Sequence, residues 1–176
     1  MKLFLKRTGL FYLYNTLAIF AGTLIAGIPA LLLRSAFQPD AFGSNIISGI
    51  IDTLCVMGLL FFLMQRDIYE RRIFSIKSVI LPSITVCLIR WVLWYISNGK
   101  AAFWVTGSST FFSPILFPDV SFEFLTKEAV YYRLISTILY DMVITIPVFV
   151  GGGYFGYWRR MHENKKMAET HEKQTK

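Results

Sequence analysis

The sequence predicts an all-α, polytopic membrane protein with four transmembrane helices. Four stretches are apolar over lengths that cross a bilayer, and the mean hydropathy of the chain is positive, with 55% hydrophobic residues. Only 16% of the 176 residues are charged, whereas a soluble domain carries about a quarter. These charges gather at the ends of the apolar stretches, so lipid is the predicted solvent for most of the chain.

The first apolar stretch follows a short basic segment, which resembles the start of a signal peptide. Its apolar part is far longer than the roughly 7–15 residues of a signal peptide, and no small-x-small cleavage site ends it, so we predict a retained helix. At about 1.5 Å per residue, each span covers roughly 28–43 Å, enough for a ~30 Å hydrocarbon core. We predict a single domain, residues 1–158, with a polar basic tail at 159–176. The four predicted spans are residues 8–33, 45–64, 78–96 and 130–158.

Most of the 18 lysine and arginine residues lie in three segments. These are the residues before the first span, the connector between the second and third spans, and the tail. Basic residues remain preferentially on the cytoplasmic side of a membrane. We therefore expect both termini in the cytoplasm, with Trp91, Trp94 and Tyr95 near the outer face. The compact size and short connectors favour a cell membrane, plasma or bacterial inner, as the location.

Residues 97–129 form the one long connector, and it is predicted to be extracytoplasmic. It is rich in phenylalanine and is interrupted by Pro114 and Pro118, so it is too broken to span. A loop this apolar is expected to lie on the membrane surface or fold back over the bundle. A lid, a docking surface for a larger membrane partner and a plain interfacial segment remain open as its role.

Three ionisable residues, Asp52, Arg90 and Asp141, lie inside apolar spans, where an isolated charge costs roughly 2.5–3.5 kcal/mol. Counted from the span ends, Asp52 and Arg90 both lie ~10 Å below the outer boundary, and Asp141 lies ~16 Å below it. Equal depth on consecutive antiparallel helices favours an ion pair between Asp52 and Arg90.

A polar stripe on the fourth span adds to these charges, because residues four apart share one face of a helix. The stripe is predicted to face the bundle interior or a water-filled cavity. Two interpretations remain open: a structural salt-bridge network that fixes helix register, or an outward-open site for a proton, an ion or a small solute. The predicted buried polar cluster comprises Asp52, Arg90, Arg133, Thr137, Asp141 and Thr145.

Small residues recur every four positions on the first and fourth spans, a pattern that lets helix backbones approach closely in lipid. We expect the two stripes to pack against each other within the monomer, and a homo-oligomer or partner interface is the alternative. The stripes are Ala18, Gly22, Ala26 and Ala30 on the first span, and Gly152 and Gly156 on the fourth.

The fourth span also contains Pro147, followed by Gly151, Gly152 and Gly153. Proline removes a backbone donor and tends to kink a helix, and glycine adds conformational freedom. This segment is the candidate hinge.

No catalytic arrangement is recognisable in the sequence. Neither Asp52 nor Asp141 lies in the GxGD context of intramembrane aspartyl proteases, and the two cysteines show no metal-ligand spacing. We expect a non-enzymatic protein without a metal or cofactor, and the membrane-flanking positions of its +7 net charge predict no nucleic-acid partner. Besides lipid, the expected partner is a larger membrane protein or a second copy. The favoured function is an accessory, regulatory or protective subunit, and the alternative is a small oligomeric transporter or channel that uses the Asp/Arg cluster.

Overall fold

The computed structural model describes residues 2–37, 41–70, 75–97, 113–117 and 126–174, and these residues are almost entirely helical. Four helical stretches are long and apolar enough to cross a membrane: Leu3–Leu33, Ile46–Glu70, Lys77–Ile96 and Lys127–Ala168. The all-α class and the four span-length helices are therefore confirmed. The elements are α1 (Lys2–Phe37), α2 (Ala41–Glu70), α3 (Lys77–Ile96), α5 (Ser113–Leu116), α6 (Lys127–Tyr140), η2 (Asp141–Thr145) and α7 (Ile146–Gln174).

Most of the long connector predicted at 97–129 lies outside the described residues. Its described parts are Ser97, the single turn of α5 with Phe117, and the start of α6. The ring of Phe117 packs on that of Tyr132, with 4.8 Å between their centroids. This contact attaches α5 to α6, and the role of the connector as a whole stays a prediction.

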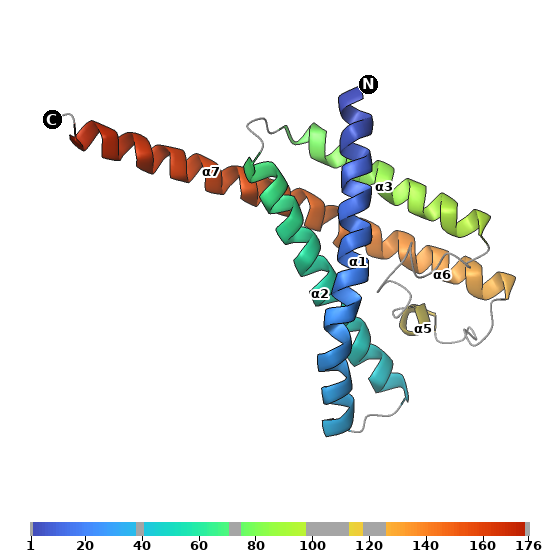
Figure 1. Ribbon diagram of the computed structural model, residues 1–176. Helices are drawn as coiled ribbons and strands as arrows, with labels where there is room; N and C mark the ends of the chain where they lie inside the picture. The colour runs from blue at the N-terminus through green and yellow to red at the C-terminus, as the bar shows by residue number, and fades with distance from the viewer. Residues whose placement is uncertain (1, 38–40, 71–74, 98–112, 118–125, 175–176) are drawn as a thin grey trace.

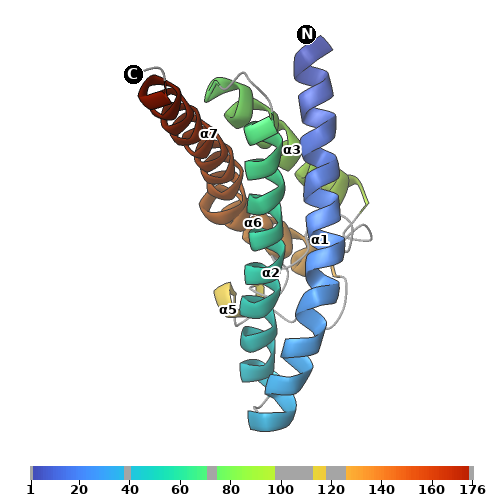
Figure 2. The same ribbon diagram turned by 60° about the vertical axis from the view of Figure 1, so that its left-hand side comes forward.

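Helix α2 lies at the centre of the arrangement and packs extensively against both α1 and α7. α1 and α2 run antiparallel as a long hairpin, α3 and α6 lie together on one side of it, and α7 carries the C-terminus away from the bundle (Figure 1). Turning the molecule shows α1 and α2 side by side (Figure 2). The hairpin end, where α1 stops and α2 starts, projects beyond α3 and α6.

The core consists of apolar side chains from all four span-length stretches. Within it, the rings of Phe11 on α1 and Phe149 on α7 stack, with 5.4 Å between their centroids. Large apolar side chains also cover the exterior, among them Leu24, Ile28 and Leu54, each more than 60% exposed. A surface this apolar is unstable in water but matches a lipid solvent. The structure is thus that of a helical membrane protein.

The glycines of the two small-residue stripes pack against α2. A Cβ added to Gly22 would lie 2.6 Å from the Cα of Val56, and one added to Gly152 would lie 2.8 Å from the carbonyl oxygen of Phe61. Gly156 meets the carbonyl of Gln65 in the same way. These three glycines therefore make close approaches to α2, and a direct contact between the two stripes stays a prediction.

The fourth predicted span is one helical stretch with an internal π-helical turn. Thr126 caps the start of α6, where its Oγ1 accepts a hydrogen bond from the backbone N–H of Ala129 at 3.1 Å. The π-helical turn η2 ends two residues before Pro147, whose ring would meet the carbonyl of residue 143 in a regular helix. Beyond the apolar part, α7 continues to Gln174, so the predicted polar tail is helical up to that residue.

The glycines of the predicted hinge have packing partners. Besides the contact of Gly152 with Phe61, a Cβ on Gly153 would lie 3.4 Å from Val79 of α3 and 3.6 Å from Ile68 of α2. Their observed role is close packing, and flexibility at Pro147 stays a prediction.

Candidate functional site

The buried charges of α3 and of the fourth span meet in an ion pair. Arg90 Nη1 lies 3.0 Å from Asp141 Oδ1, and the two side chains are only 2% and 0% exposed. The second carboxylate oxygen, Oδ2, accepts a hydrogen bond from the indole N–H of Trp91 at 2.8 Å. Arg90 Nη1 also lies 3.5 Å from the amide oxygen of Asn15 on α1. Three span-length stretches are therefore tied together at one point.

This arrangement lowers the cost of holding charges inside the bundle. Each oxygen of the Asp141 carboxylate has a donor, and hydrogen bonds to ionised groups are stronger than those between neutral groups. The pair is neutral as a unit, whereas removing one member of such a buried pair typically costs about 3–5 kcal/mol. With exposures near zero, neither charge is within reach of a dissolved solute.

Arg90 thus takes Asp141 as an ion-pair partner, although the sequence favoured Asp52 for that role. The predicted contact between Arg90 and Asp52 stays a prediction. Two residues of the cluster were not predicted. Asn15 is an isolated amide inside the first apolar span, a signal that was present in the sequence. Trp91 was expected to mark the outer face, and its position next to Arg90 was the clue to a polar role.

The rest of the polar stripe differs in burial along the helix. Thr137 and Thr145 are fully buried, and Arg133 is partly exposed. The Thr137 hydroxyl donates to the backbone carbonyl of Arg133 at 2.8 Å. Within the described part of the chain, the hydroxyls of Thr145 and Ser136 are buried without a hydrogen-bond partner. The part of the stripe at Thr137, Asp141 and Thr145 is therefore internal.

Nearer the hairpin end, Asp52 lines a cavity of about 240 Å³ between α1 and α2. Asp52 and Ser48 are only 4% and 8% exposed, and both carboxylate oxygens of Asp52 are buried. Its walls contain small residues, whose short side chains leave the volume open. We call it the α1–α2 groove, and it is lined by Thr23, Ala26, Gly27, Ala30, Leu31, Ser48 and Asp52.

The opposite end of the bundle carries polar ties between α2 and its two neighbours. The Tyr14 hydroxyl of α1 donates to Asp67 Oδ1 of α2 at 3.0 Å. The Tyr69 hydroxyl of α2 donates to Glu163 of α7, which also accepts from Arg159 Nε at 2.9 Å. These contacts hold the bundle together where the apolar spans end.

The described residues include no group of three or more histidine, cysteine or acidic side chains close enough to hold a metal ion.

Comparisons with known proteins add no further constraint. No family model matches the chain, and no curated protein and no solved structure is significantly similar to it.

Proposed function

We propose that this protein is a small integral membrane protein that acts as an accessory, regulatory or protective subunit of a larger membrane system. The observation that carries the proposal is the closed Arg90–Asp141 pair, with exposures of 2% and 0%. A transport site has to bind and release its solute, so its charges need access to water. A buried pair with donors on both carboxylate oxygens is instead suited to fixing how α1, α3 and the fourth span pack.

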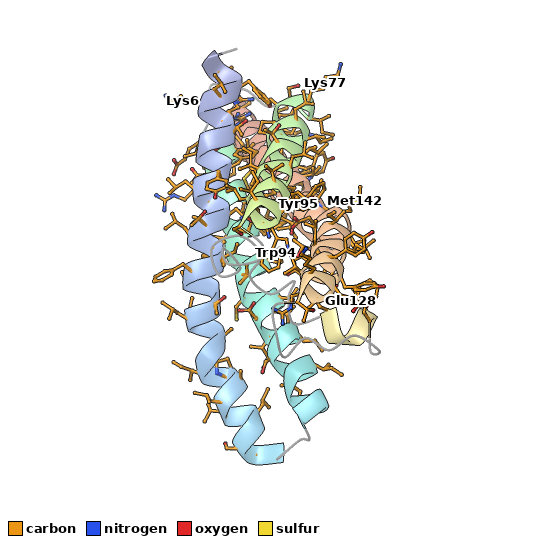
Figure 3. The ribbon with its side chains drawn as sticks, turned by 90° about the vertical axis from the view of Figure 1, so that its right-hand side faces the viewer. Lys6, Lys77, Trp94, Tyr95, Glu128 and Met142 are labelled. Atoms are coloured by element: carbon orange, nitrogen blue, oxygen red, sulfur yellow. The ribbon has the colours of Figure 1, made fainter. Side chains whose placement is uncertain are left out.

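The proposal includes an orientation with both termini in the cytoplasm of a plasma or inner membrane. Lys6 and Lys77 lie at the same end of the bundle (Figure 3), opposite the hairpin end. Basic residues from two separate segments at one end support this orientation, because lysine and arginine favour the cytoplasmic side.

The alternative function is a small oligomeric transporter or channel. The acidic α1–α2 groove is the observation that favours it, because a carboxylate in a cavity can bind a cation.

The test uses the full chain with a C-terminal tag, purified from its native membranes in a mild detergent. We expect a larger membrane protein to co-purify in a fixed ratio, and we expect the purified protein alone to produce no proton, sodium or potassium flux in liposomes above that of empty liposomes. Flux by the lone protein that disappears in Asp52→Asn would overturn the accessory role in favour of transport. Purification without any stoichiometric partner would also contradict it.

A further inference from the structure

The last turns of α7 reach past the bundle and have one side that is held against α2. The Nη1 group of Arg160 donates to the carbonyl of Ile68 at 3.5 Å, and Glu163 accepts a hydrogen bond from the Tyr69 hydroxyl. From there α7 continues to Gln174 and carries the C-terminus away from the other helices (Figure 1, Figure 2).

The opposite side of this segment is exposed. Successive residues of an α-helix are about 100° apart, so Trp158 and Lys165 lie on the side of α7 opposite Arg160 and Glu163, with Met161 beside them. Trp158 and Met161 are 44% and 49% exposed, and Lys165 is exposed as well. We call the side that carries Trp158, Met161 and Lys165 the outer face of α7.

Apolar groups come first along the outer face, and a basic group follows. Tyr154, one turn before Trp158, is also on this side and is 55% exposed. Tryptophan and tyrosine are enriched at the level of the lipid headgroups. Lys165 lies about 10 Å further along the helix than Trp158. This order matches the passage from the hydrocarbon core to the headgroup layer.

The segment carries an excess of positive charge. Residues 158–168 contain four basic side chains and one acidic side chain. The acidic residue, Glu163, accepts from Arg159 Nε at 2.9 Å as well as from Tyr69, so its charge lies toward α2. The outer face therefore attracts anions, and each lysine or arginine near an anionic membrane surface contributes about 1 kcal/mol of binding.

Lys165 also borders an open hollow on this surface, which is lined by Met161, His162, Asn164 and Lys165. The Lys165 ammonium and the Asn164 amide can both donate hydrogen bonds to a phosphate oxygen, and the methionine offers an apolar contact. A phospholipid combines the two kinds of group that this lining accepts, a phosphate and an apolar chain.

The direction of α7 keeps this segment close to the bilayer. In Figures 1 and 2, α7 is inclined to the α1–α2 hairpin as it leaves the bundle. A helix inclined to the spans rises more slowly from the membrane surface than one that continues parallel to them. The basic side chains after Trp158 therefore remain within reach of headgroups.

From these observations we propose that the outer face of α7 binds the headgroups of anionic phospholipids, with Lys165 and Lys166 attracting the lipid charge and Trp158 and Met161 contacting the upper part of the acyl chains. The proposal does not depend on the accessory role.

The test maps lipid contacts in the full-length protein by cross-linking. Benzoylphenylalanine replaces Met161, and the protein is placed in nanodiscs that contain equal amounts of labelled phosphatidylglycerol and phosphatidylcholine. We expect illumination to attach phosphatidylglycerol about fivefold more often than phosphatidylcholine, the ratio that corresponds to about 1 kcal/mol. The same probe at Leu54, which is 68% exposed in the middle of α2, should attach both lipids equally.

Two charge variants identify the residues responsible. Lys165→Gln together with Lys166→Gln should bring the ratio at position 161 close to one, because exposed positions on this helix tolerate glutamine and only the charge is removed. Lys6→Gln is the matched control, since Lys6 is an exposed lysine at the same end of the bundle but on α1. It should leave the ratio unchanged. Salt at 1 M should also bring the ratio toward one, because it shortens the screening length to about 3 Å.

A ratio near one in the unmodified protein would overturn the proposal, as would a preference that survives loss of both lysines or falls equally in Lys6→Gln. Inorganic phosphate at constant ionic strength should not change the ratio. If it abolished the preference, the face would be a site for free phosphate and not for lipid. If the double lysine variant kept the lipid preference but lost a co-purifying protein, the face would belong to a protein interface, and lipid binding would be refuted.

Discussion

Replacing Gly22 by alanine is expected to push α1 away from α2. The added Cβ would lie 2.6 Å from Val56 Cα, 2.8 Å from its Cγ2 and 2.9 Å from its backbone nitrogen. The helices would have to separate locally by about 0.8 Å, the difference between 2.6 Å and an ordinary contact of 3.4 Å. Two of the three obstructing atoms belong to the α2 backbone, so rotation of the Val56 side chain cannot relieve the clash.

The expected size of the effect follows from two opposing contributions. Forcing one extra methyl group into a well-packed contact costs typically about 1–3 kcal/mol. Alanine recovers up to about 1 kcal/mol over glycine through its higher helix propensity. We expect Gly22→Ala to lower the free energy of unfolding by about 1–2 kcal/mol, because the backbone clash outweighs the gain in helix propensity.

The assay is reversible unfolding in mixed micelles by increasing the fraction of dodecyl sulfate, followed by circular dichroism. Gly9→Ala and Gly27→Ala are matched controls on the same helix, since an added Cβ meets nothing within 4 Å at either position. Both controls should be unchanged or up to about 1 kcal/mol more stable. If Gly22→Ala is as stable as the unmodified protein, or the controls lose as much stability, then α1 does not pack closely on α2 through this residue.

Two further predictions concern the polar cluster, and both are read in the same unfolding assay. Asp141→Asn should lower the free energy of unfolding by about 3–5 kcal/mol, because Arg90 then remains buried without its counter-charge, and the double variant Arg90→Met, Asp141→Leu should recover most of that loss. A double variant no more stable than Asp141→Asn would argue against a purely structural pair. Thr145→Val should be within about 1 kcal/mol of the unmodified protein or more stable, since it removes a fully buried hydroxyl that has no hydrogen-bond partner in the described part of the chain. If Thr145→Val lowered the free energy of unfolding by more than about 2 kcal/mol, the Thr145 hydroxyl would have to make a stabilising hydrogen bond.

Several features of this protein follow from local sequence alone. The four span-length helices could be predicted because a bilayer accepts only long apolar helical segments or closed barrels, so span length is a local property. The close packing of Gly22, Gly152 and Gly156 was predictable for a related reason, since only small residues let backbones approach in lipid. The inward orientation of Thr137, Asp141 and Thr145 followed from the cost of exposing polar groups to hydrocarbon.

The identity of each contacting partner was decided by the tertiary structure. The observed ion pair joins Arg90 to Asp141, with Asn15 and Trp91 completing the cluster, and the contact between Arg90 and Asp52 stays a prediction. Likewise, Gly22, Gly152 and Gly156 all pack on α2, a partner that their spacing alone does not identify. The physical reason is that lipid is as apolar as the protein core, so hydropathy does not tell a helix-facing side from a lipid-facing one. Helix order, tilt and the reach of an arginine side chain determine which groups meet, and these properties depend on the whole bundle.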